Sequence, residues 1–133
     1  GGPPPRPAFP GSPSVASAPG ERLGALLRLA CFDGSFAPSA QLERLTGVGE
    51  RGARAWGEQC WGGGAAPAAE ILVTARVLAH LSREHGSEEA TWQLLARKAE
   101  DWLLARRPEW RRAGAETVGQ LVAAAADWPH GAP

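Results

Sequence analysis

The sequence predicts an all-α fold, a small orthogonal helical bundle of about five to six helices. Two observations predict the bundle. Apolar residues recur with a period near 3.6 in several segments, and Gly or Pro separates those segments. A third observation predicts a disordered Pro/Gly-rich lead-in. Residues 1–20 hold seven Pro and four Gly, so they bury too little apolar area to offset their ordering entropy. We therefore expect a disordered linker over 1–20, a helical interaction domain over 21–128 and a disordered tail over 129–133.

The first half of the domain is expected to form three short helices. The first covers 21–31 and is stopped by the Asp33-Gly34 pair, which favours a turn. Ser39 is the predicted N-cap of the second helix, and Gly47 ends it after about two turns. The third helix is predicted over 50–61, where the glycine run that follows breaks the pattern.

The second half is expected to form three more helices. Pro67 suits the first turn of a helix that ends at Gly86, and Ser87 is the predicted N-cap of the next one, which ends before Pro108. These two helices carry the clearest apolar periodicity and should form an antiparallel hairpin. A last helix is predicted over 115–127.

Composition disfavours several classes of partner. Lys and Arg together equal Asp and Glu at 14 each, so no net charge draws the chain to phosphate backbones or anionic lipid. No apolar run approaches the roughly 20 residues of a membrane helix. We expect a cytoplasmic protein that binds neither nucleic acid nor a membrane. Because the chain starts Gly1-Gly2 and has no Met, we also expect it to be a fragment of a longer protein.

The sequence predicts neither catalysis nor a cofactor. Cys31 and Cys60 lack the spacing of a metal or redox pair, and we expect both to be buried thiols. The three histidines do not complete a four-donor zinc set with them. No nucleophile elbow, phosphate-binding loop or metalloprotease motif is present. We therefore predict a non-enzymatic protein with no catalytic, metal or cofactor site.

One local pattern is similar to a helix-hairpin-helix motif. Residues 45–55 read LTGVGERGARA, in which Gly47-Val48-Gly49 would join two helices. Such a turn can offer backbone N–H groups to a phosphate at the start of the second helix. Glu50 stands beside Arg51, however, and phosphate-binding hairpins lie in basic surroundings. The preferred interpretation is a plain inter-helix turn, with a nucleic-acid module as the alternative.

Tryptophan is frequent, with six residues in 133. Indoles are enriched both in cores and in the energetically dominant parts of interfaces. Trp92 and Trp102 follow the helical period and favour a core position, whereas Trp110 and Trp128 lie outside the strong helices and favour an interface. We take Trp92, Trp102, Trp110 and Trp128 as the candidate partner-binding residues.

Three stretches resemble a known family. Residues 26–36 read LLRLACFDGSF, and the stretches 74–81 and 92–103 read TARVLAHL and WQLLARKAEDWL. These resemble the "LLxLQxxDGSF" and "TALALAWLE…WELLxxKAxxWL" patterns in a C-terminal region of the von Willebrand factor A domain-containing protein 5 group. The vault poly(ADP-ribose) polymerase carries that region more distantly. The resemblance implies a helical C-terminal domain of a larger VIT and von Willebrand A-type protein, with the major vault protein as candidate partner.

The predicted function is therefore non-enzymatic protein–protein interaction by a C-terminal helical domain. Two alternatives stay open at this point. One is the nucleic-acid module described above, and the other is a structural tail that packs on upstream domains of its own chain. Salt dependence separates nucleic-acid binding from an apolar protein interface, because only phosphate contacts weaken steeply as salt rises.

Overall fold

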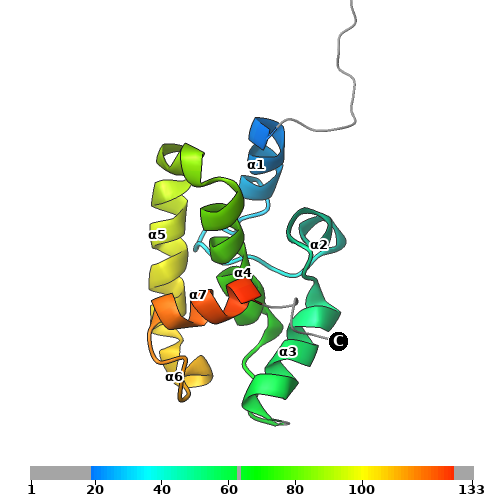
Figure 1. Ribbon diagram of the computed structural model, residues 1–133, viewed down its shortest axis with the longest axis vertical. Coiled ribbons are helices and arrows are strands. Elements are labelled where there is room, and N and C mark those ends of the chain that lie inside the picture. Colours follow the sequence, from blue (N-terminus) through cyan, green and yellow to red (C-terminus); the bar gives the residue numbers. More distant parts are fainter. Residues whose placement is uncertain (1–18, 63, 128–133) are drawn as a thin grey trace, which may run out of the picture.

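The computed structural model describes residues 19–62 and 64–127. These described residues form the predicted all-α bundle. They contain two isolated β-bridges but no β-strand. Figure 1 shows the helices arranged around α4. The predicted linker lies outside the described residues except for Pro19 and Gly20, which begin α1, and the predicted tail lies wholly outside them. The helices are α1 (Pro19–Leu27), α2 (Ala40–Thr46), α3 (Glu50–Trp61), α4 (Ala69–Glu84), the 3₁₀ turn η1 (Gly86–Glu88), α5 (Glu89–Ala105), α6 (Arg107–Trp110) and α7 (Val118–Asp127).

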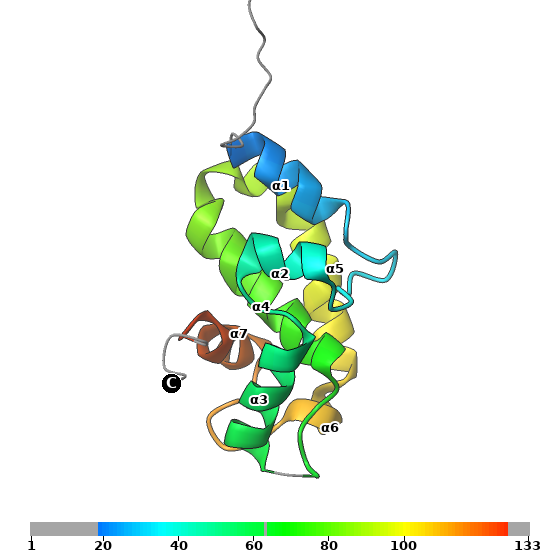
Figure 2. The ribbon, with the colours of Figure 1, turned by 90° about the vertical axis from the view of Figure 1, so that its right-hand side faces the viewer.

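Helix α4 is the centre of the bundle. It contacts α2, α3, α5 and α7, and Figure 2 shows it with neighbours on several sides. Every residue from Ile71 to Ala79 is buried, as expected for a helix covered all round. The predicted antiparallel hairpin is confirmed, since η1 joins α4 to α5 and the two helices lie side by side.

One buried cation sits on this central helix. The Arg76 guanidinium donates from Nη1 to the carbonyls of Ala125 and Ala126, at 3.1 and 3.2 Å, and from Nη2 to the Thr46 carbonyl at 3.3 Å. These carbonyls lie at the C-terminal ends of α7 and α2, where helices leave acceptors unpaired and carry partial negative charge. Burial, and next the charge of Arg83, lower the pKa of Arg76. The side chain thus ties two helix ends to α4.

The first predicted helix is shorter than expected. It ends at Leu27, not near Cys31. Ala30 pairs with Phe36 in an isolated bridge, and the Cys31 N–H donates to the Ser35 carbonyl at 2.8 Å. The backbone groups that would have extended the helix are thereby used to close a loop. The prediction of two buried thiols also needs correction, because Cys31 and Cys60 are free and only half-buried.

The ends of the later helices also differ from the predictions. Ser87 does not cap α5, because it lies within η1 and α5 begins only at Glu89. The last helix begins at Val118 rather than near residue 115. There the Thr117 hydroxyl accepts from the Gln120 N–H, and the Gln120 side chain accepts from the Thr117 N–H. This reciprocal pair is a capping box, which fixes the start of α7.

Replacing Arg76 by Met should lower the free energy of unfolding by about 2–4 kcal/mol, because three helix-end carbonyls lose their donor while the apolar volume is kept. Urea denaturation followed by tryptophan fluorescence measures the change. Arg83→Met is the matched control on the same helix: its side chain is exposed, so a change below about 0.5 kcal/mol is expected. Equal denaturation midpoints for the two variants would refute the tying role of Arg76.

Candidate functional site

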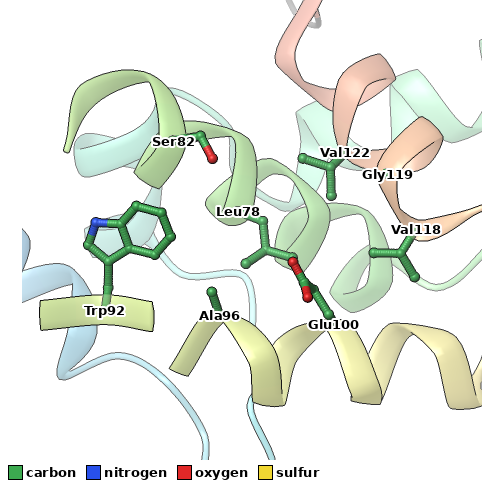
Figure 3. Close-up of a pocket in the computed structure, with 8 residues that line it drawn as sticks. All are labelled: Leu78, Ser82, Trp92, Ala96, Glu100, Val118, Gly119 and Val122. Carbon is green, nitrogen blue, oxygen red and sulfur yellow. The ribbon is translucent and has the colours of Figure 1, made fainter. Parts of the chain in front are cut away.

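An open groove lies between α4, α5 and α7. Figure 3 shows its lining side chains converging from the three helices. The hollow has a volume of about 290 Å³. Its apolar part comes from one residue of α4, two of α5 and two of α7. The complete lining is Leu78, Ser82, Trp92, Ala96, Glu100, Val118, Gly119 and Val122.

The indole of Trp92 is a fixed part of this groove. Its Nε1–H donates to the His85 carbonyl at 2.8 Å, which ties the ring to the C-terminal end of α4. The buried His85 ring in turn faces the Glu88 carboxylate, with Nδ1 3.2 Å from Oε1. Trp92 is 6% exposed. Its polar atom is therefore satisfied inside the protein, and the ring contributes apolar surface to the groove.

The polar residues of the groove lie along α5 and at one position of α4. Ser82 and Glu100 line the main hollow, and both also line an adjoining hollow of about 240 Å³. The adjoining hollow adds Glu89, Gln93 and Arg97. No ion pair joins Glu89, Arg97 and Glu100 to one another or to any other described residue. Two carboxylates and one guanidinium thus face the groove and its extension.

Of the three predicted partner-binding indoles that lie among the described residues, only Trp92 lines the groove. Trp102 is 7% exposed and lies beneath Arg106, whose guanidinium carbon is 4.2 Å from the ring centroid. Trp110 is fully buried and donates its Nε1–H to the Leu103 carbonyl at 2.8 Å. The surface position favoured for Trp110 is therefore replaced by a core position, because α6, which the sequence did not predict, turns the ring inward. Trp128 lies outside the described residues.

A second exposed apolar feature was not identified from the sequence. Phe32 is 90% exposed at the tip of the loop between Ala30 and Phe36, while Phe36 is buried. The loop is held by Asp33, whose Oδ1 accepts from both the N–H and the hydroxyl of Ser35, and these bonds lower the Asp33 pKa. A Cβ at Gly34 would stand 2.7 Å from the α5 backbone, so only glycine fits there. The sequence shows the turn but does not tell which phenylalanine faces outward.

The hairpin between α2 and α3 has the backbone shape that the sequence pattern predicts. Gly47 adopts φ 85°, Val48 is buried, and Gly49 is the N-cap of α3. Two carboxylates nevertheless occupy this helix start. A Cβ at Gly49 would lie 2.5 Å from the Glu43 carboxylate, and Glu50 forms an ion pair with Arg54. The Glu43 carboxylate would repel a phosphate and counteracts the favourable helix dipole, and the ion pair with Glu50 already engages Arg54.

Among residues 19–62 and 64–127, no group of three or more His, Cys, Asp or Glu side chains could hold a metal ion. Nor is any described helix both long and apolar enough to cross a bilayer. Comparison with known proteins gave no match, whether to a family model, a curated protein or a solved structure. The site's geometry is therefore the basis for the function proposed below.

The hairpin predicts no nucleic-acid binding. Labelled duplex DNA should show no anisotropy change with the wild-type chain at physiological salt, because carboxylates already occupy the helix start. Arg51→Glu combined with Arg54→Glu should leave that result unchanged and lower stability little, since exposed ion pairs contribute about 0–1 kcal/mol. Binding that weakens steeply with salt and disappears in the double variant would instead identify a phosphate site.

The histidine pair predicts a loss of stability in mild acid. The rings of His80 and His85 lie 5.6 Å apart, and burial, with the nearby His85 as a lesser cause, lowers the pKa of His80 to about 4. The unfolded chain, with an ordinary histidine pKa near 6.5, takes up this proton more readily than the folded one. Stability should therefore be full above about pH 6.5 and fall as the pH drops toward 4.

After discounting for solvent screening, we expect His80 to contribute roughly 1–2 kcal/mol of this loss. Urea denaturation at pH 7.5 and pH 5 measures it, and His80→Gln should reduce the difference between the two pH values. An identical pH dependence in the wild type and the variant would exclude His80 as its source.

Proposed function

We propose that this chain is a protein-binding domain that uses the groove between α4, α5 and α7 as its interface. One observation carries the proposal: an open hollow whose apolar lining comes from Leu78, Trp92, Ala96, Val118 and Val122, in a domain of this small size. The energetically dominant contacts of protein interfaces are typically side chains of one partner that fill such a hollow on the other. The fixed indole adds contact area without a further loss of side-chain freedom on binding.

The size and chemistry of the groove favour a polypeptide ligand over a small molecule. A volume of about 290 Å³ lies at the lower limit for small-ligand pockets, which run from about 300 to 1,000 Å³. Such pockets also enclose most of the ligand's surface, whereas this groove is open. Ser82 and Glu100 supply the polar atoms of the main hollow outside the indole. This space suits one or two apolar side chains of a partner protein.

The major vault protein is the first candidate partner, on the strength of the resemblance of residues 26–36, 74–81 and 92–103 to the family named above. The carboxylates at the start of α3 argue against the nucleic-acid alternative. A structural tail that packs on upstream domains of its own chain would bury the same groove. That alternative predicts binding to those domains in isolation instead of binding to a separate protein.

A substitution that fills the groove tests the proposal. A Cβ at Gly119 would meet only the Thr117 hydroxyl, at 3.9 Å, so a side chain can begin there without a clash. Gly119→Leu should leave stability equal or raise it by about 0.5–1 kcal/mol, since glycine disfavours helix. The same side chain would occupy the hollow. We expect binding of purified major vault protein to weaken at least tenfold, as measured by biolayer interferometry.

Gly20→Leu is the matched control. Gly20 is likewise the second residue of its helix, and a Cβ there meets nothing within 4 Å. It should bind as the wild type does. If purified major vault protein does not bind, the wild type, Gly119→Leu and Gly20→Leu are each used to capture proteins from cell lysate, and the captured proteins are quantified. A set of captured proteins that is unchanged by Gly119→Leu would mean that the groove is not the interface.

A further inference from the structure

We infer that the groove accepts an amphipathic helix whose apolar stripe is flanked by lysine or arginine. This inference rests on the proposed function and adds the backbone form and the charge of the segment that binds. It draws on three properties of the groove: the groups available to a partner's backbone, the charges of the lining, and the shape of the two adjoining hollows.

The groove offers few hydrogen-bonding partners to the backbone of a ligand, and this favours a helical ligand over an extended one. An extended segment would bring unpaired N–H and C=O groups, each of which loses free energy when it leaves water without a new partner. The described residues form no sheet to which a strand could be added, and the main hollow offers mostly aliphatic and aromatic side chains. A helix satisfies its own backbone and presents only side chains. The groove therefore suits the helix-in-groove mode of recognition.

The charges of the lining decide which helix fits. Glu100 lines both hollows and lies between them, and Glu89 lies in the second hollow. Arg97 lines only the second hollow. Neither carboxylate has an ion-pair partner among the described residues. The two carboxylates outnumber the one guanidinium in the second hollow, so a cation placed beside the apolar stripe of the ligand is favoured there over an acidic residue.

The two hollows also set the spacing along the ligand. Ser82, Trp92, Ala96 and Glu100 are common to both hollows, so they form one continuous depression along α5. One turn of a bound helix can place an apolar side chain in the main hollow while a residue three or four positions away reaches the second. That neighbour is where we assign the basic residue.

The test uses the full chain and two synthetic probes of about four turns. One is a helical peptide of leucine and lysine in an amphipathic pattern, and the other has glutamate in place of every lysine. Fluorescence anisotropy of the labelled peptides measures Kd. We expect the leucine–lysine peptide to bind at least tenfold more tightly than the leucine–glutamate peptide. A leucine–lysine peptide with a central proline, which breaks the helix, should bind at least tenfold more weakly than the unbroken one.

Three variants of the protein locate the binding. Gly119→Leu should weaken binding of the leucine–lysine peptide at least tenfold. Glu100→Gln should weaken its binding about three- to fivefold, because one charge-assisted contact is lost. Asp101→Asn is the matched control, since Asp101 is the next residue of α5, is exposed and does not line the groove. It should leave Kd unchanged.

The outcomes separate this inference from the proposed function. If both peptides bind equally and Gly119→Leu blocks both, the groove is an interface but the charge preference is refuted. If the proline-containing peptide binds as well as the helical one, the helical form is refuted. Binding insensitive to Gly119→Leu, or no binding of either peptide, also overturns the inference. The proposed function is then judged separately by the capture of protein partners with the wild type and Gly119→Leu.

Discussion

The carbonyl groups at the C-terminal ends of helices are the constraint on which the rest of this structure depends. A bundle of short helices has many such ends, and a buried carbonyl without a donor is costly. Long side chains from other elements supply the donors here. Arg76 serves the ends of α2 and α7, while the indoles of Trp92 and Trp110 serve the C-terminal ends of α4 and α5. Trp61 does the same for the last residue of α6, by donating to the Trp110 carbonyl at 2.8 Å.

This use of tryptophan explains the core and creates the groove. An indole that donates to a helix end is fixed at one edge, and its ring then packs wherever the neighbouring helices leave room. For Trp110 the neighbours close completely around the ring. For Trp92 they leave an opening, because Gly119 stands on the α7 side with no side chain and Ala96 follows on α5. The candidate binding surface is therefore a consequence of how the bundle satisfies its backbone.

The groove and the Phe32 loop represent two different ways of exposing apolar surface. The groove is concave and is formed where α7 packs beside the hairpin of α4 and α5. The loop is convex and local, since Asp33 and Gly34 hold the turn that places Phe32 in water. Single exposed apolar residues are common on protein surfaces. A concave surface that combines apolar walls with unpaired carboxylates is the more selective of the two, which is why our proposals concern the groove.

The sequence by itself determined the all-α class, the central hairpin, and the breaks at Gly47 and Gly62, because periodicity and glycine conformation are local properties. It also marked Trp92 and Trp102 as members of one helix face. Only the tertiary structure decided that Trp110 is core, that Phe32 rather than Phe36 faces water, and that Ser82, Glu100 and Gly119 line one groove. Arg76 illustrates the physical reason: its acceptors lie up to 50 residues away. Periodicity tells which face of a helix is apolar, whereas the position of neighbouring helices decides how much of that face is covered.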